Sequence, residues 1–226
     1  MTERRTDGRR TAAATRRRER EAQILAATRA LFDERGVRDA QIEDIASAVG
    51  TNRAIIYRHF SGKEELFALT LVGYLDELHE RLQKVAAAET APRDQLVAIV
   101  TEFADFGLEF PAFVDCAQTL MRRPGPELLD EISESALFRL GRAISGCLRT
   151  ITDVLDAGVA DGTFDIDDTN LLANHMYASG LGALQLARVG MLIKEAAPGI
   201  PTIAPLSPEQ VKRYLVASAT ALAARD

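Results

Sequence analysis

Residues 41–63, QIEDIASAVGTNRAIIYRHFSGK, constrain the fold of this chain more than any other stretch. Four apolar residues at positions i, i+3, i+4 and i+7 predict one face of a short helix. These residues are Ile42, Ile45, Ala46 and Val49. Gly50 is expected to end that helix, because a sharp turn favours a residue without a β-carbon. Asn52 can then cap a second helix through its side-chain oxygen. The stretch therefore predicts two short helices joined by a tight turn.

The second of these helices is expected to present a polar, cationic face. Ile55, Ile56 and Phe60 anchor it from behind. The outward residues include no acid, and they are Thr51, Asn52, Arg53, Ala54, Tyr57, Arg58 and His59. A helix with such a face, held across another by a glycine turn, suits the major groove of DNA. The alternative is an ordinary helical hairpin with a solvated face.

A third helix is predicted to follow at once. Ser61 and Glu64 have the spacing of a capping box, in which each side chain bonds the backbone N–H of the other residue. This places Lys63 in the first turn, where a cation is unfavourable for the helix dipole. The position makes sense if Lys63 faces a phosphate there.

Together these residues resemble the DNA-binding domain of the tetracycline-repressor (TetR) family, over roughly residues 16–70. The matching positions are Phe32, Gly36, Ile45, Ala46, Gly50, Ile56, Tyr57, Phe60, Lys63, Glu64, Glu65 and Leu66. The resemblance implies an all-α fold of about nine helices. An N-terminal three-helix helix-turn-helix domain would precede a larger C-terminal helical domain for ligand binding and dimerisation. It also implies that the last two helices pair in a dimer and that a small ligand releases the DNA.

Two positions depart from the family pattern. Gln41 stands where the family usually has a threonine that caps the helix and touches phosphate. Glutamine caps less well, so Asp39 is the expected cap, while Gln41 stays a candidate DNA contact. Ala54 stands where many members have glycine, and its methyl group could meet a thymine methyl group.

Charge divides the chain in the same way as the predicted domains. Residues 1–63 carry 14 Lys/Arg against 9 Asp/Glu, whereas the remainder carries 13 against 24. We predict a disordered, Arg-rich tail over residues 1–15, a DNA-binding domain over 16–62 and a helical domain over 63–226. The tail is either a solubilising segment or an arm that contacts DNA.

Catalytic and metal-binding patterns are missing from the sequence. It contains no GxSxG, HExxH or P-loop motif, and its three histidines are scattered, so we predict neither an enzyme nor a cofactor or metal site. Cys116 and Cys147 have no CxxC spacing and fit buried thiols in a reducing cytoplasm, although a redox pair is the alternative. No signal segment or membrane-spanning run is evident, so we expect a cytoplasmic protein.

Helical patterns continue to the end of the chain. We predict helices over residues 16–35, 62–88, 92–109, 127–160 with a bend near 133–135, 168–189 and from 208 onward, plus one beginning at Pro111. Ser207 is the predicted cap of the last helix, and Asp167 or Asp168 of the one before it. Residues 195–208 are rich in proline and are predicted to form a loop.

An aromatic stripe in the C-terminal half has two interpretations. Phe103, Phe106, Phe110 and Phe113 either pack as plain core or form one wall of an apolar ligand cavity. The resemblance favours the cavity. The candidate ligand-binding residues are Phe103, Phe106, Phe110, Phe113, Cys116, Leu120, Cys147, His175 and Tyr177.

The segment ASGLGALQ lies in a helical pattern without a preceding strand, so its glycines do not predict a phosphate loop. Ala173, Gly180 and Ala187 recur every seven residues, which predicts a close contact with another helix. Together with the pairing of the last two helices that the family resemblance implies, this leads us to expect a homodimer formed by residues 167–189 and 207–224. The predicted function is a DNA-binding transcriptional regulator, a repressor released from a palindromic operator by a small, largely apolar ligand. The alternative is a ligand-independent architectural or interaction protein of the same fold.

Overall fold

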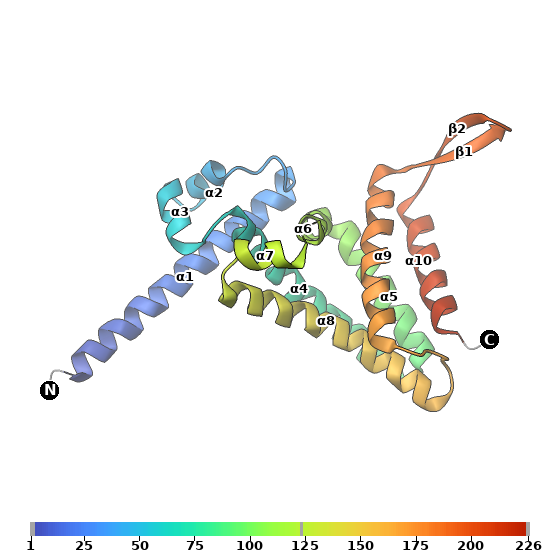
Figure 1. Cartoon of the computed structure of the whole chain (residues 1–226), viewed down its shortest axis with the longest axis horizontal. Helices are drawn as coiled ribbons and strands as arrows, with labels where there is room; N and C mark the ends of the chain where they lie inside the picture. Colours follow the sequence, from blue (N-terminus) through green and yellow to red (C-terminus); the bar gives the residue numbers. More distant parts are fainter. Residues whose placement is uncertain (1–2, 123, 225–226) are drawn as a thin grey trace. The chain divides into compact units, whose positions relative to one another are not determined.

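A computed structural model describes residues 3–122 and 124–224, which form ten helices and one β-hairpin (Figure 1). The all-α prediction is thereby confirmed for the main body of the chain. The helices are α1 (Glu3–Arg35), α2 (Ile42–Ala48), α3 (Arg53–His59), α4 (Lys63–Ala88), α5 (Pro92–Glu109), α6 (Pro111–Met121), α7 (Gly125–Glu131), α8 (Glu134–Asp161), α9 (Thr169–Val189) and α10 (Pro208–Ala223). The strands are β1 (Met191–Ala197) and β2 (Ile200–Pro205).

The chain divides into two compact units. The first consists of Met1–Leu71 with Thr119–Leu140, and the second of Val72–Gln118 with Gly141–Asp226. The predicted boundary after residue 62 thus differs from the observed division. The first turns of α4, together with α7 and the start of α8, belong to the unit that contains α2 and α3.

The core of the first unit forms where α1, α2, α3 and the start of α4 bury their apolar faces. Ile24, Ile45 and Ile56 are almost fully buried. The rings of Phe32 and Phe67 meet edge to face, with centroids 4.9 Å apart. This apolar contact fixes α1 against α4 and leaves the polar face of α3 outside.

Helix α1 begins earlier than predicted. It starts at Glu3 rather than near residue 16, so the segment predicted to be a disordered tail is helical from Glu3 onward, while Met1 and Thr2 lie outside the described residues. The run TAAATRRRERE explains the difference, because alanine, arginine and glutamate are among the strongest helix formers. The high charge and low hydrophobicity of residues 1–15 indicated disorder. These properties do not prevent a segment from extending a helix whose later turns are packed in the core.

Glu65 takes part in two features near this unit's core. The expected helix over residues 127–160 has its interruption where the bend near 133–135 was predicted, but the interruption is a full break between α7 and α8. There the Ser133 hydroxyl accepts from Ala136 N–H at the start of α8 and donates to Glu65 Oε1 at 2.5 Å. The expected capping partner of Ser61 was Glu64, but Ser61 N–H donates to Glu65 Oε2 instead. Glu65 is only 6% exposed, so these bonds replace the water it has lost. They also hold the pKa of Glu65 below its ordinary value against the opposing effect of burial.

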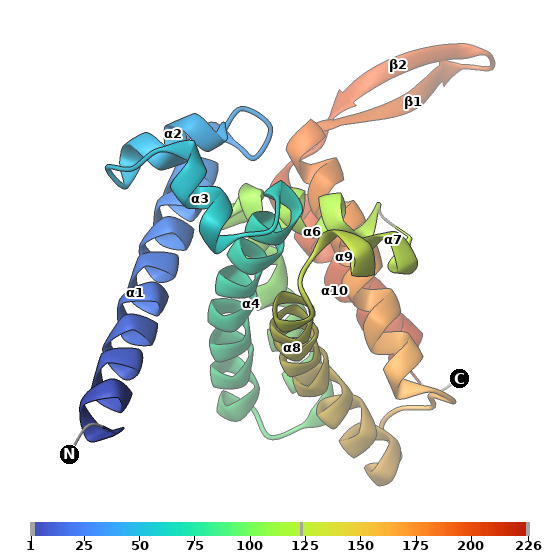
Figure 2. The same cartoon turned by 60° about the vertical axis from the view of Figure 1, so that its left-hand side comes forward.

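The second unit packs α5, α9 and α10 together with the later turns of α4 and most of α8 (Figure 2). Four rings form its densest part: Phe106 contacts Phe110 and Phe113 at centroid distances of 4.9 and 5.3 Å, and Tyr74 lies beside them. Asp168 and Ser207 accept from backbone N–H groups as the N-caps of α9 and α10, which confirms both predicted caps.

A β-hairpin joins α9 to α10, where the sequence predicted a loop (Figure 1). Strand β1 pairs antiparallel with β2, and Gly199 has a φ of +77° at the turn. The prediction was wrong because the prolines were interpreted only as strand breakers. Proline is tolerated in an edge strand where its nitrogen points away from the partner strand.

Candidate DNA-binding surface and apolar pocket

The turn between α2 and α3 is built by local hydrogen bonds. Gly50 adopts a φ of +63°, and the next N–H, that of Thr51, donates to Ala46 O at 2.8 Å. Asn52 Oδ1 then accepts from Ile55 N–H at 3.1 Å and starts α3. Both predicted short helices and the predicted cap of the second one are confirmed. The cap leaves the amide NH₂ of Asn52 as the group available to another molecule.

Arg53 lies at the exposed start of α3 and is already oriented. Its Nη1 donates to Glu43 Oε1 of α2 at 3.0 Å, and its guanidinium carbon lies 5.3 Å from the centroid of the Tyr57 ring. Interaction with the Tyr57 hydroxyl and then with the Glu43 carboxylate raises the pKa of Arg53, which is charged in any case. An exposed ion pair is weak and easily exchanged. The guanidinium is therefore both positioned and free to change partner.

The other predicted DNA contacts divide into exposed and half-buried groups. Asn52, Ala54, Tyr57 and Arg58 are exposed, as predicted. Thr51 and His59 are half-buried. Nδ1 of His59 is buried and has no hydrogen-bond partner among the described residues, so this side chain is less outward than predicted. Burial, followed by the charge of Arg17, lowers the pKa of His59 and favours the neutral ring.

Gln41 and Lys63 lie at the edges of this surface. Gln41 is exposed and is itself the N-cap residue of α2, where its N–H donates to Asp44 Oδ2 at 3.2 Å, so the expectation that Asp39 caps this helix is wrong. Lys63 begins α4, and its Nζ lies 5.0 Å from the centroid of the Phe67 ring. A cation–π contact places the ammonium group at the first turn without neutralising its charge.

Lys63→Ala is expected to weaken binding to every DNA sequence alike. The ammonium would approach a phosphate, which carries no sequence information, and each lost contact releases one fewer counterion. The slope of log K against log salt should therefore fall in magnitude by about one unit per DNA-contacting subunit. Fluorescence anisotropy across a salt series measures that slope, and an unchanged slope would remove Lys63 from the interface.

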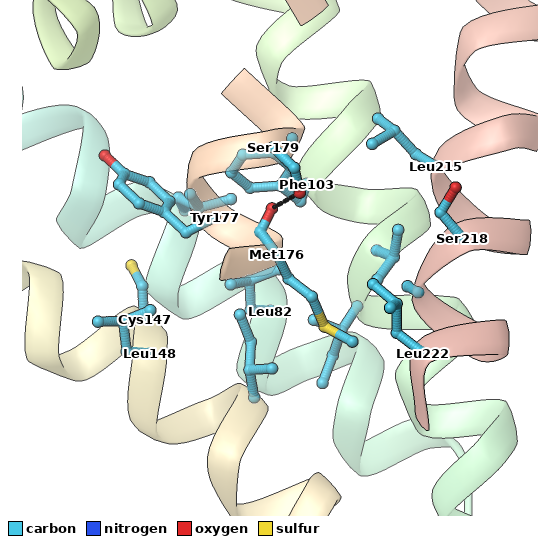
Figure 3. Close-up of a pocket in the computed structure, with 16 residues that line it drawn as sticks. Leu82, Phe103, Cys147, Leu148, Met176, Tyr177, Ser179, Leu215, Ser218 and Leu222 are labelled. Carbon is cyan, nitrogen blue, oxygen red and sulfur yellow. Dashed lines mark hydrogen bonds between the residues drawn. The ribbon is translucent and has the colours of Figure 1, made fainter. Parts of the chain in front are cut away.

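An apolar pocket lies within the second unit, between α4, α5, α8, α9 and α10 (Figure 3). Its free volume is about 50 Å³. Figure 3 shows Leu215, Ser218 and Leu222 of α10 across from Cys147 and Leu148 of α8. Ser179, Ser218 and Leu222 are exposed residues, so the pocket opens where α9 and α10 face outward.

The polar groups around the pocket are few and uncharged. Ser179 donates its hydroxyl proton to the backbone of its own helix, at His175 O. Cys147 Sγ donates to Leu75 O at 3.3 Å, and burial raises the pKa of this thiol to about 12. Burial likewise raises the pKa of the Tyr177 hydroxyl, which points away from α10 in Figure 3. A neutral, largely apolar molecule is the only kind that such walls accept without the cost of a buried charge.

Three of the nine predicted ligand-binding residues line this pocket, namely Phe103, Cys147 and Tyr177. Phe106, Phe110 and Phe113 instead pack against one another, and Cys116 is buried without lining the pocket, so the plain-core interpretation holds for that part of the stripe. Leu120 belongs to the first unit, and His175 is exposed on α9. The cavity prediction failed for these residues because helical spacing identifies a buried face but not the empty space behind it.

Sequence reasoning missed most of the pocket wall. The missed residues are Leu78, Leu82, Ile99, Val100, Leu148, Ile151, Met176, Ser179, Gly180, Leu215, Ser218, Ala219 and Leu222. Most are aliphatic residues on the inner faces of their helices, and that pattern is the same for a solid core. Ser179 and Ser218 are hydroxyl residues on otherwise small or apolar helix faces. They are the only residues of this set that could have indicated a solvent-exposed edge of a pocket.

The outer faces of α9 and α10 remain apolar and exposed. Leu171 and Tyr214 are each 68% exposed, and Leu186, Val189 and Leu222 are also exposed. Small residues lie among them, including Ala178, Gly182, Ala217 and Ala221. The predicted seven-residue contact series, by contrast, faces inward: Ala173, Gly180 and Ala187 are buried within the chain. A β-carbon on Gly180 would lie 2.6 Å from Phe103 Cε1 of α5, so an intramolecular contact explains this glycine.

Residues 24–70, which include the whole turn and α3, match the profile described as "Bacterial regulatory proteins, tetR family". Residues 24–70 are therefore a DNA-binding domain of the TetR family. The HTH-type transcriptional repressor KstR2 of Rhodococcus jostii (strain RHA1) is 29% identical over 150 residues, which cover 66% of this chain and 70% of the relative.

Solved structures share this fold over most of the chain. The crystal structure of RolR in complex with resorcinol superposes with a TM-score of 0.67 at 17% identity, covering 93% of this chain and 90% of RolR. FadR from Bacillus subtilis in complex with stearoyl-CoA gives 0.63 at 13% identity, covering 89% and 98%. The curated relatives that this chain resembles are transcriptional regulators.

Two kinds of feature are missing from the part of the chain that the structure describes. No helix in that part is long and apolar enough to cross a membrane. No group of three or more His, Cys, Asp or Glu residues there is placed to hold a metal ion.

Proposed function

We propose that this TetR-family regulator represses transcription as a homodimer bound to a near-palindromic operator, and that a small, neutral, largely apolar ligand in the pocket of the second unit releases it. The observation that carries the proposal is the pairing of two features in one chain. An exposed cationic helix start at Arg53 suits a DNA groove, and an apolar pocket with free volume suits a ligand.

The DNA-binding part rests on the geometry of α3. Its N-terminal residues Asn52, Arg53 and Ala54 are exposed, and the N-terminal part of a recognition helix reaches base edges. Tyr57, Arg58, His59, Thr51, Gln41 and Lys63 lie around them as candidate backbone contacts. One helix of seven residues covers few base pairs, so a two-fold pair of such helices is needed to select a site in a genome.

The dimer part rests on the exposed faces of α9 and α10. Monomeric proteins rarely expose a contiguous apolar patch, and small residues within it allow two helix pairs to approach closely. In a two-fold dimer the same patch is used by both subunits. The pocket opens on this face, so a second subunit would cover Ser179 and Leu222 at its rim.

Gly182→Leu is expected to weaken the dimer at least about tenfold without unfolding the subunit. A β-carbon at Gly182 would meet nothing within 4 Å inside the chain, so the added side chain obstructs only an external partner. Gly180→Leu is the matched control two residues away. It should lower the melting temperature through its clash with Phe103, because the new side chain enters the core. Sedimentation equilibrium separates the two effects, and an intact Gly182→Leu dimer would place the interface elsewhere.

The ligand part follows from the chemistry of the pocket wall. Resorcinol and stearoyl-CoA are bound by the related structures, and both bring apolar carbon to a TetR fold. The free volume here is small, so a ligand must either be compact or displace flexible side chains such as Met176. A solid core would instead favour the ligand-independent architectural protein.

Two steps test the proposed function. Selection of bound DNA from a random pool should return a near-palindromic site with half-sites about one helical turn apart, or a multiple of it. Neutral apolar metabolites are then screened for release of that DNA, with ionised metabolites of similar size as controls. Selection without any enriched sequence would contradict sequence-specific regulation. Enrichment without release by any compound would favour the architectural alternative.

A further inference from the structure

The hairpin between α9 and α10 is the least expected part of this chain, and most of its apolar side chains have no cover. Ile193 is 84% exposed and Ile203 is 69% exposed, while Met191 and Ile200 are at least half exposed. Figures 1 and 2 both show the two strands extending beyond the ends of α9 and α10.

The pairing register places Met191, Ile193 and Ile203 on one face, whereas Ile200 pairs with Ala197 beyond the irregularity between Glu195 and Ala197. Ile193 lies directly opposite Ile203, and Met191 opposite Pro205. Because alternate residues of a strand share a face, these four side chains form one apolar surface. The opposite face carries Leu192, which packs at the stem against the cluster of Ala187, Leu206 and Val211. The stem is therefore anchored in the second unit, while the apolar face of the ribbon is left open.

A two-stranded ribbon with an open apolar face is not a stable end state. An isolated hairpin is marginal in water and needs a further strand or a packed partner. Addition of a further strand along β2 is disfavoured by its prolines. Leu206 N–H donates to Gly190 O, which fixes the alternation of inward and outward backbone groups along β2. In this register the nitrogens of Pro201 and Pro205 lie on the outer edge of the ribbon. Proline offers no N–H to an added strand. A partner must therefore bury the apolar face of the ribbon through side-chain contacts rather than by adding a strand.

The exposed face of the hairpin continues that of α9. Leu186 and Val189 are exposed on the last turns of the helix, Gly190 ends it with a φ of +68°, and Met191 begins the ribbon face. A surface continuous with the proposed dimer face should meet the same partner. Lys194 and Glu195 are the only charged residues in β1 and β2, so the ribbon has no net charge with which to attract DNA phosphates.

We propose that the hairpin is a dimerisation arm, whose apolar face packs on a second copy of this chain and extends the α9–α10 interface. This inference rests on the proposed homodimer. Because a two-fold interface uses each residue twice, one pair of isoleucines contributes four buried side chains to the dimer. Glu195 shares this face at the end away from Met191, and the two isoleucines between them have the apolar character of interface anchors.

The test compares two double variants of the full-length chain. Ile193→Ser with Ile203→Ser removes the apolar face, whereas Lys194→Ser with Thr202→Ser changes a directly opposed pair on the other face. Both variants place two serines at directly opposed positions of the ribbon. The first should raise the dimer dissociation constant by about a hundredfold, as expected for four lost apolar anchors, and the second by less than about threefold. Sedimentation equilibrium gives both constants, and circular dichroism verifies that both variants remain folded.

A third variant guards against local misfolding of the ribbon. The stem is closed by the 2.9 Å hydrogen bond between Leu206 N–H and Gly190 O, so a short Gly-Ser linker can replace residues 191–205. This deletion should match the Ile193→Ser/Ile203→Ser variant. If the wild type, that variant and the deletion all dimerise with equal affinity, the hairpin is not a dimerisation arm. If Gly182→Leu still dissociates the dimer in that case, the α9–α10 interface stands and only the arm fails. If the Ile193→Ser/Ile203→Ser variant lost binding to anionic lipid vesicles that the wild type shows, while its dimer affinity stayed unchanged, the ribbon would bind a membrane surface. That result would also contradict the proposed dimerisation arm.

Discussion

Replacing Arg53 with alanine is expected to weaken operator binding roughly tenfold to a hundredfold and to relax specificity at one or two base pairs per half-site. The guanidinium begins α3, where side chains reach deepest into the groove, and it can bond both acceptors of a guanine at once. In the free protein it is held by Glu43 and Tyr57, so it is pre-oriented before DNA arrives. Binding to the selected operator and to single-base variants of it measures both effects.

Glu43→Gln provides a matched comparison for Arg53→Ala. It leaves the guanidinium intact but weakens the ion pair that orients it. Specificity should therefore be retained in Glu43→Gln and lost in Arg53→Ala. If Arg53→Ala lost affinity equally for every sequence, with a reduced salt slope, Arg53 would be a phosphate contact like that proposed for Lys63.

The second large effect expected is a reciprocal antagonism between ligand and operator, each weakening the other's affinity by about 1–3 kcal/mol or more. Helix α4 carries Lys63 at its first residue and the pocket residues Leu78 and Leu82 in its later turns. Its 26 residues at about 1.5 Å each make a stiff element about 40 Å long. A tilt of a few degrees at the pocket would move the DNA-binding end by ångströms. Two recognition helices must match half-sites at a fixed spacing, so a small displacement weakens binding.

Calorimetry tests this coupling directly. A ligand identified by the release screen is titrated into free protein and into the operator complex. Linkage requires that its affinity fall in the complex by the same factor by which it weakens DNA binding. Val100→Phe, which fills part of the pocket wall, should keep operator affinity while losing the ligand. Equal ligand affinity for free and operator-bound protein would contradict this coupling through α4, however tightly the ligand bound.

The DNA-binding half was predictable because its signals are local. Gly50, Asn52 and the apolar spacing of α2 each act within a few residues, so the sequence alone identified both helices, the turn between them and the exposed start of α3. The same locality explains the small errors. The cap of α2 was assigned to Asp39 instead of Gln41, and the partner of Ser61 to Glu64 instead of Glu65. In both cases the candidates are only one or two residues apart, and side-chain geometry decides between them.

The pocket and the outer faces were not predictable in the same way. Phe103 and Phe106 lie on one helical stripe and both rings contact Phe113, yet only Phe103 lines the pocket. Gly180 and Gly182 are two residues apart, yet the first faces α5 and the second faces outward. Periodicity specifies which face of a helix is buried. It carries no information about which neighbour covers that face or how completely.

By itself the sequence determined the all-helical body, the helix-turn-helix and its cationic surface, and the N-caps of α3, α9 and α10, because each depends on contacts between residues close in the chain. Only the tertiary structure decided where empty volume remains among α4, α5, α8, α9 and α10 and which face of α9 stays open. It also decided that the proline-rich segment after α9 pairs as a ribbon rather than a loop. The physical reason is that packing, register and burial are properties of segments far apart in sequence, and an apolar residue satisfies many such arrangements equally well.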